Sequence, residues 1–291
     1  MKKRNILYLL LTLTITLIMT GCSPKTNKQD GKISIVTTTN IYADIAKNVV
    51  GKYGTAKAII ANSAIDPHDF EPTTNDAKTL SEADIVVANG LGYDSWVNKL
   101  SKGVDKKPVL VGEDLMKLKV GDNPHIWYNL SMPEKYVNYL VERLGKLQPK
   151  HRAYFEAQAK QYLKAINEIK QLAHGIKTKD NKPVFVSEPV FDYALEEAGI
   201  KIGDRDFEEA IEKETDPSAQ VIDQMTAAIK QRKIAFFVNN VQASSSTVKT
   251  FVKLAKAHNI PVLKVRETIP NNTTYLAWMR ENYQNLAKVT Q

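Results

Sequence analysis

The sequence of 291 residues contains a single cysteine, Cys22, so no disulfide can form within the chain. The fold must therefore be stabilised by a hydrophobic core, and the 270 residues from Cys22 onward are enough for two domains of ordinary size. The sequence also has no HExxH motif and no convincing Ser–His–Asp arrangement. These absences argue against a disulfide scaffold and against the common classes of hydrolase.

Apart from three basic residues near the N-terminus, charge of one sign is not concentrated in the chain. The formal net charge is +8, and Lys2, Lys3 and Arg4 account for three of these positive charges, which leaves about +5 for the remainder. Lysine and arginine are spread among aspartate and glutamate, and no nucleic-acid-binding motif occurs. We therefore expect no nucleic-acid partner and a solvated surface compatible with an anionic membrane face.

The N-terminus has the features of an export signal. The basic residues 2–4 precede an uncharged, largely apolar run from Ile6 to Met19, which is too short for a membrane span of ~20 residues but suits the core of a signal peptide. The run leads into Met19-Thr20-Gly21-Cys22, which resembles a lipobox. We predict a signal peptide at 1–21, lipidation of Cys22, a polar tether at 22–31 with a reach of up to ~30 Å, and a location on the extracytoplasmic face of the membrane. The alternative is an ordinary signal peptide followed by an unrelated cysteine.

From residue 32 onward, short apolar runs alternate with amphipathic segments, which predicts an α/β fold with parallel sheets flanked by helices. The predicted strands are Ile33–Val36, Ala58–Ile60, Ile85–Val87, Val109–Val111, Val184–Val186, Ile234–Val238 and Val262–Val265. The predicted helices include 41–50, 73–82, 94–101, 189–198, 217–231 and 245–258.

One longer segment, from about Lys150 to Ile176, interrupts this alternation. Its apolar residues recur in steps of four and three, as on one face of a single long helix: Phe155, Ala159, Tyr162, Ile166, Ile169, Ala173 and Ile176. Strand–helix units lie on both sides of it. We predict an N-terminal lobe at 32–146, a rigid linking helix within 147–179 and a C-terminal lobe at 180–291; the alternative is one continuous sheet on which the helix packs.

Two of the five histidines follow prolines in loops. His68 lies in Asp66-Pro67-His68-Asp69 and His125 lies in Asn123-Pro124-His125, whereas the other three lie in polar helical segments. Ligands of open α/β sheets bind at the carboxyl ends of strands, and a preceding proline restricts the backbone that aims the imidazole.

Two glutamates occupy matching places in the second half. Glu188 follows the strand 184–186 and Glu267 follows the strand 262–265. Two imidazoles and two carboxylates would provide four ligands and two negative charges, enough to neutralise a divalent cation. Alternatively, each glutamate could simply stabilise the N-terminus of a helix.

The segments at 66–73 (DPHDFEPT) and 123–127 (NPHIW), together with Glu188-Pro189-Val190 and Glu267-Thr268-Ile269-Pro270, resemble the cluster A-I zinc/manganese solute-binding lipoproteins of ABC importers. The resemblance covers essentially the whole chain after Cys22. It implies two lobes joined by one long helix, with a metal ion held between them by His68, His125, Glu188 and Glu267. The third position is glutamate in manganese binders of this family, and the fourth, commonly aspartate, is Glu267 here.

The resemblance implies capture of one divalent ion, Zn²⁺ or Mn²⁺, by a monomer that delivers it to an ABC importer permease. Glu188 favours Mn²⁺ slightly, because carboxylates suit this ion better than imidazole does. The alternatives are a secreted metal-dependent hydrolase and a surface adhesin. Four protein ligands enclosed between lobes would leave little room for the bound water of a hydrolase, so we expect no enzyme.

Overall fold

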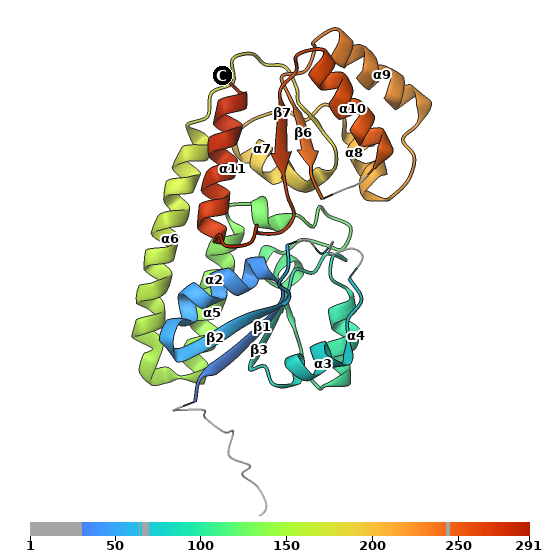
Figure 1. The fold of residues 1–291 in the computed structure, drawn as a ribbon. Coiled ribbons are helices and arrows are strands. Elements are labelled where there is room, and N and C mark those ends of the chain that lie inside the picture. Colours follow the sequence, from blue (N-terminus) through green and yellow to red (C-terminus); the bar gives the residue numbers. More distant parts are fainter. Residues whose placement is uncertain (1–30, 64, 66–69, 243–244) are drawn as a thin grey trace, which may run out of the picture.

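The computed structural model describes residues 31–63, 65, 70–242 and 245–291, and it contains two separate parallel sheets (Figure 1). The signal segment, Cys22 and His68 lie outside these described residues. Within the described ranges, no helix is long and apolar enough to cross a membrane.

The N-terminal sheet has the strand order β2-β1-β3-β4, and all of its pairs are parallel. Alternate residues of β1 face opposite layers: Ile33 and Ile35 pack with α2 and α5, whereas Val36 packs with α3 and α4. The elements are β1 (Ile33–Thr39), α2 (Asn40–Val50), β2 (Gly54–Ile60), α3 (Thr74–Ser81), β3 (Ile85–Ala88), α4 (Trp96–Gly103), β4 (Val109–Leu110) and α5 (Met132–Leu147).

The C-terminal sheet has the order β5-β6-β7, again with parallel pairs. Its two faces also separate by alternation, since Val186 and Val238 join the layer of α7 and α11, while Phe185 and Phe237 join the layer of α8, α9 and α10. The elements are β5 (Phe185–Val186), α7 (Asp192–Glu197), α8 (Arg205–Glu212), α9 (Ala219–Lys230), β6 (Phe237–Asn240), α10 (Ser246–Ala257), β7 (Val262–Val265) and α11 (Tyr275–Val289).

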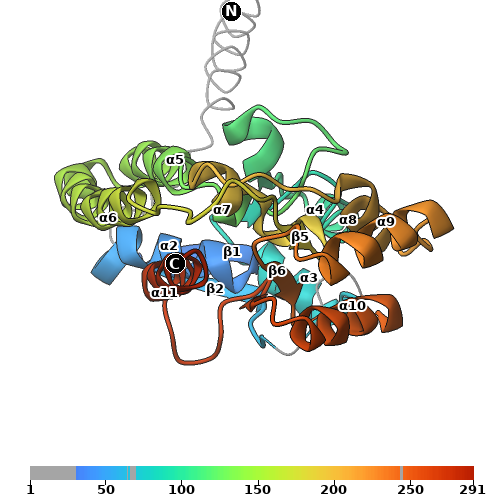
Figure 2. The same cartoon turned by 90° about the horizontal axis from the view of Figure 1, so that it is seen from above.

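One long helix, α6 (Arg152–His174), runs along the side of both lobes (Figures 1 and 2). Its buried face consists of six of the seven apolar residues that were predicted to share one face, from Phe155 to Ala173. This face packs against α2, α5 and α11. The helix is shorter than the predicted segment because a 3₁₀ turn precedes Arg152 and because Gly175 ends the last turn, which leaves Ile176 outside. The predicted fold class is confirmed, and two sheets replace the alternative of a single continuous one.

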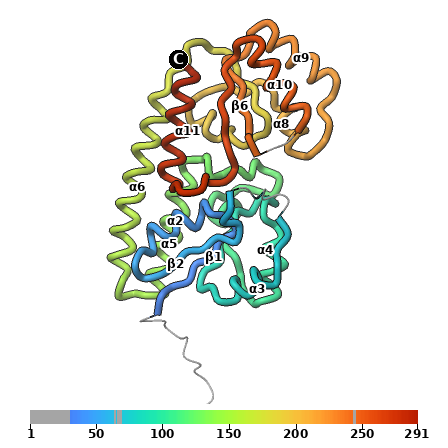
Figure 3. The backbone as a smooth tube through the Cα atoms, in the orientation of Figure 1, coloured from blue at the N-terminus to red at the C-terminus, as the bar shows by residue number. Residues whose placement is uncertain are grey.

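The C-terminal segment forms a second connection between the lobes (Figure 3). After β7 the chain approaches α2, where the Tyr275 N–H donates to Asp44 Oδ2 at 3.0 Å, and α11 then returns alongside α6. A single buried cluster includes residues of β1, α2, α5, α6, α11 and all three C-terminal strands. The lobes therefore share one hydrophobic core through these helices.

Candidate metal site

Three of the four predicted ligands are buried where strands of the two lobes end. His125 lies in the loop before the 3₁₀ turn Ile126–Tyr128, Glu188 follows β5, and Glu267 follows β7. Their exposed fractions are 0%, 7% and 3%. The fourth predicted ligand, His68, lies outside the described residues.

The His125 ring is oriented by Asn123. The Asn123 Oδ1 atom accepts the His125 backbone N–H at 3.0 Å and lies 2.8 Å from Nδ1 of the same ring. The Asn123 amide nitrogen donates instead to the Pro189 carbonyl at 2.7 Å, so its oxygen is the acceptor facing the ring. Nδ1 therefore carries the hydrogen, and Nε2 is the nitrogen that can bind a metal ion.

The two carboxylates share one amide donor. Asn240, the last residue of β6, donates through Nδ2 to Glu188 Oε2 at 3.2 Å and to Glu267 Oε1 at 2.7 Å. The Tyr93 hydroxyl, from the other lobe, donates to Glu267 Oε2 at 3.1 Å. These hydrogen bonds hold the two carboxylates beside each other at the ends of β5 and β7.

Glu267 and His125 face each other across the lobe boundary, with Oε2 and Nε2 separated by 4.0 Å. Two ligand atoms at ~2.0–2.1 Å from one tetrahedral ion would lie somewhat closer than this, so a small inward shift would let both contact a shared ion. Among His, Cys, Asp and Glu side chains of the described ranges, no group of three is assembled closely enough to hold a metal ion.

Hydrogen bonds on both sides of the site connect the lobes. The Tyr128 hydroxyl donates to the Arg266 carbonyl at 2.7 Å, and the Thr268 hydroxyl donates to the Ser63 carbonyl at 3.2 Å. Burial raises the pKa of Tyr128 well above its usual value, so the hydroxyl remains a neutral donor. The two lobes are thus joined at residues that flank the candidate ligands.

The three remaining histidines have other surroundings. His151 stacks on Tyr53 with ring centroids 3.8 Å apart, and exposed His174 pairs with Glu197 at 2.6 Å. His258 caps the C-terminus of α10. Their surface positions agree with the polar helical segments in which they occur.

A buried acidic cluster in the C-terminal lobe has its own counterion. The Arg205 guanidinium contacts Asp192 Oδ2 at 2.7 Å and Glu208 Oε1 at 3.3 Å, both on nearly inaccessible carboxyls. Burial raises the pKa of Asp192 to about 6, and burial together with the Asp192 charge raises the pKa of Glu208 to about 9. Asp192 is thereby paired with Arg205.

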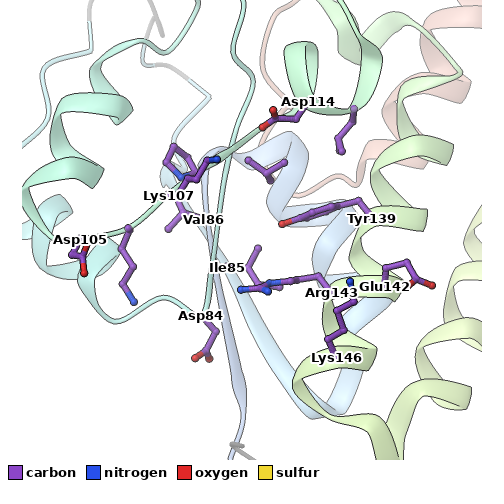
Figure 4. A pocket seen from close by; sticks show the side chains of 14 residues that line it. Asp84, Ile85, Val86, Asp105, Lys107, Asp114, Tyr139, Glu142, Arg143 and Lys146 are labelled. Atoms are coloured by element: carbon purple, nitrogen blue, oxygen red, sulfur yellow. The ribbon is translucent and has the colours of Figure 1, made fainter. Parts of the chain in front are cut away.

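A pocket of about 730 Å³ lies elsewhere in the N-terminal lobe, between the start of β3, the segment before β4 and the end of α5. Figure 4 shows Arg143 and Lys146 of α5 opposite Asp105 and Lys107, with Asp84 below. Its lining carries both signs of charge, and among the described residues it includes none of His125, Glu188 and Glu267. The pocket lies beside Ile85, the first residue of β3, and therefore at the amino end of this strand. Open α/β sheets bind ligands at the carboxyl ends of their strands.

The sequence matches a family model over residues 35–289, which is described as zinc-uptake complex component A, periplasmic (ZnuA). This match covers most of the chain. The chain belongs to this family. ZnuA-family members are solute-binding proteins for metal transport and not enzymes, which agrees with the predicted family and the predicted absence of catalysis.

Curated relatives agree with the family model. A metal ABC transporter substrate-binding lipoprotein of Lactococcus lactis subsp. lactis is 30% identical over 213 residues, covering 66% of this chain and 67% of the relative. The manganese ABC transporter substrate-binding lipoprotein PsaA of Streptococcus pneumoniae serotype 4 is 24% identical over 99% of both chains. The zinc-binding lipoprotein AdcA of the same organism is 25% identical over 97% of this chain and 60% of AdcA.

Two solved structures of metal-bound proteins share the fold. FpvC of Pseudomonas aeruginosa in complex with Mn²⁺ has a TM-score of 0.72 at 20% identity, covering 89% of this chain and 98% of FpvC. The Zn(II)-bound ZnuA-like domain of Streptococcus pneumoniae AdcA has a TM-score of 0.69 at 24% identity, covering 89% and 99%. Both likenesses support the two-lobed architecture described above.

Three residues beside the candidate ligands were not identified from the sequence: Tyr93, Asn123 and Asn240. Asn240 could have been found by the rule that selected the glutamates, because it follows the predicted strand 234–238 closely. Asn123 and Tyr93 have no comparable local signal, since their contacts depend on how loops fold back.

Proposed function

We propose that this protein captures one divalent transition-metal ion, Zn²⁺ or Mn²⁺, outside the cytoplasm and delivers it to the permease of an ABC importer. The observation that carries the proposal is that buried Glu267 of one lobe faces buried His125 of the other at 4.0 Å, while the Asn240 amide joins Glu267 to buried Glu188. Family membership over residues 35–289 supports the same role.

The proposed ligands are His68, His125, Glu188 and Glu267. The two imidazoles would be neutral, and the two carboxylates would supply two negative charges. These charges would balance a divalent cation in a site with little solvent. Nitrogen and oxygen donors of this kind suit both Zn²⁺ and Mn²⁺. Relatives whose names specify zinc or manganese occur side by side among the similar proteins.

The proposal includes attachment of a monomer to the extracytoplasmic face of the cell membrane through lipidated Cys22. The names of the relatives, which are lipoproteins, support this attachment. It also divides the chain into a signal peptide (1–21), tether (22–31), N-terminal lobe (32–146), linking helix (147–179) and C-terminal lobe (180–291). Neither a metal-dependent hydrolase nor a dedicated adhesin is supported, because the family consists of metal-transport proteins.

Metal-dependent stabilisation tests the proposed site. A ligand that binds only the folded state raises the melting temperature, so Zn²⁺ and Mn²⁺ should each stabilise the purified protein with a stoichiometry of one ion per chain. His125→Ala and His68→Ala should remove most of this shift, whereas His174→Ala, at an exposed position, should preserve it. Equal losses in all three variants would contradict the site, and no stabilisation of the wild type by either ion would contradict the function.

A further inference from the structure

Asn240 lies between the two candidate carboxylate ligands because β6 is the central strand of its sheet. The strands on either side are β5 and β7, after which Glu188 and Glu267 follow. Asn240 is buried, with only 1% of its surface exposed. Its Nδ2 donates to Glu188 Oε2 at 3.2 Å and to Glu267 Oε1 at 2.7 Å. One amide nitrogen thus contacts a carboxylate from each neighbouring strand.

The orientation of this amide is determined by its other partners. Asn240 Oδ1 accepts the Gln242 backbone N–H at 3.1 Å, and a backbone N–H can only donate. The Asn240 backbone N–H donates to Ser187 Oγ at 2.9 Å, which holds the end of β6 beside the end of β5. A flipped amide would place its oxygen against two carboxylates and its nitrogen against the Gln242 N–H, which is also a donor, so the nitrogen faces the carboxylates.

One oxygen of each carboxylate accepts from Asn240. The other oxygen of Glu267, Oε2, accepts from the Tyr93 hydroxyl and lies 4.0 Å from His125 Nε2. If Glu267 bound a metal ion through both oxygens, Oε1 would share its lone pairs between the ion and the Asn240 amide, and Glu188 Oε2 would do the same. Metal binding by these two oxygens would therefore weaken the hydrogen bonds of a buried amide donor, which is unfavourable.

We propose that Asn240 is a specificity-determining residue that restricts Glu188 and Glu267 to one metal-bound oxygen each and so favours Zn²⁺ over Mn²⁺. The proposal rests on the proposed function of the same site. Zn²⁺ is satisfied by four ligand atoms in tetrahedral geometry, whereas Mn²⁺ prefers six, largely oxygen. This site could supply the fifth and sixth ligand atoms for Mn²⁺ if Glu188 and Glu267 each bound the ion through both oxygens. The contacts of Asn240 therefore counteract the preference for Mn²⁺ that Glu188 would confer by its ligand type alone.

Competitive titration of Zn²⁺ and Mn²⁺ at one pH tests the proposal on wild type, Asn240→Ala and Asn239→Ala. Asn239 is the matched control, because it precedes Asn240 in β6 and is partly exposed. The ratio of Zn²⁺ to Mn²⁺ affinity should fall roughly tenfold in Asn240→Ala, which corresponds to releasing one or both carboxylates from the amide, and should stay unchanged in Asn239→Ala. An unchanged ratio in a folded, metal-binding Asn240→Ala variant would overturn the proposal.

X-ray absorption spectroscopy of the metal-loaded wild type provides a test that needs no variant. We expect carboxylate carbon atoms at the distance of monodentate ligation with either ion, and bidentate ligation by Glu188 or Glu267 in the wild type would overturn the proposal. A wild type that binds neither ion would instead contradict the proposed function, so the two failures can be told apart.

Discussion

Asn123 holds the imidazole of His125 through a single oxygen atom, which accepts the backbone N–H at 3.0 Å and lies 2.8 Å from Nδ1. The same residue connects the lobes, because its Nδ2 donates to the Pro189 carbonyl at 2.7 Å and its carbonyl accepts from the Tyr193 hydroxyl at 3.0 Å. The residue that aims the histidine is therefore also attached to the segment that follows Glu188. Asn123 therefore both orients the His125 ring and joins the two lobes.

Asn123→Ala should weaken metal binding about 10- to 100-fold, the usual effect of removing a residue that orients a metal-binding histidine. Isothermal titration with Zn²⁺ measures the change. Asn123→Asp keeps the oxygen that accepts from Nδ1 but loses the amide donor to Pro189, so it should bind metal more tightly than Asn123→Ala. Equal weakening in both variants would show that the contact to Pro189, not ring orientation, matters for affinity.

Glu188→His should raise the preference for Zn²⁺ over Mn²⁺ by about tenfold, because it replaces an oxygen ligand with an imidazole and removes one negative charge. Competitive titration of both ions on the wild type and the variant measures the ratio. Glu267→Asp is the matched control: it retains charge and ligand type and changes only reach, so its effect should be milder than that of Glu267→Ala. If Glu188→His leaves the ratio unaltered, Glu188 does not bind the ion directly.

Glu208→Gln should flatten the pH dependence of stability. The pKa of Glu208 is raised to about 9 by burial and by the Asp192 charge, so the folded state retains a proton that the unfolded state releases. Stability from this group is therefore present at low pH and is lost as the pH rises from about 4.5 towards 9. Between pH 5 and pH 9 the variant should gain at least about 1 kcal/mol relative to wild type in urea unfolding.

Glu209→Gln is the control for this experiment, since Glu209 is exposed and pairs only with Lys213 in the described part of the chain. It should leave the pH dependence of the wild type unchanged. A parallel response of Glu208→Gln and wild type across this pH range would mean that Glu208 is ionised in the folded protein.

Cys22→Ser should release the protein from the membrane fraction or leave an uncleaved precursor. One acyl chain gives only marginal membrane attachment, so stable retention requires the several chains of a bacterial lipoprotein. Fractionation of cells followed by immunoblotting compares the variant with wild type. Normal processing and unchanged membrane retention of Cys22→Ser would refute lipid anchoring at this residue.

Local patterns were sufficient for much of the fold. All seven predicted strands occur, and the buried face of α6 follows the predicted spacing from Phe155 to Ala173, because alternation and helical periodicity are properties of short segments. Helices α5, α8 and α11 were not among the predicted helices, although α5 buries Tyr136, Leu140 and Leu144 at helical spacing. The helical spacing of apolar residues was therefore present in the sequence of α5. The same holds for α11, which buries Tyr275 and Met279 on one face.

The positions of Glu188 and Glu267 after strands, and of His68 and His125 after prolines, are local features that identified all four as candidates from the sequence. Which of their atoms meet depends on the tertiary structure. The order β5-β6-β7 places Asn240 between two carboxylates that are distant in the sequence, and the folding of the loop before His125 brings the Asn123 oxygen to Nδ1. Strand order and loop closure depend on contacts between residues far apart in the chain, and no short window of sequence contains both partners of such a contact.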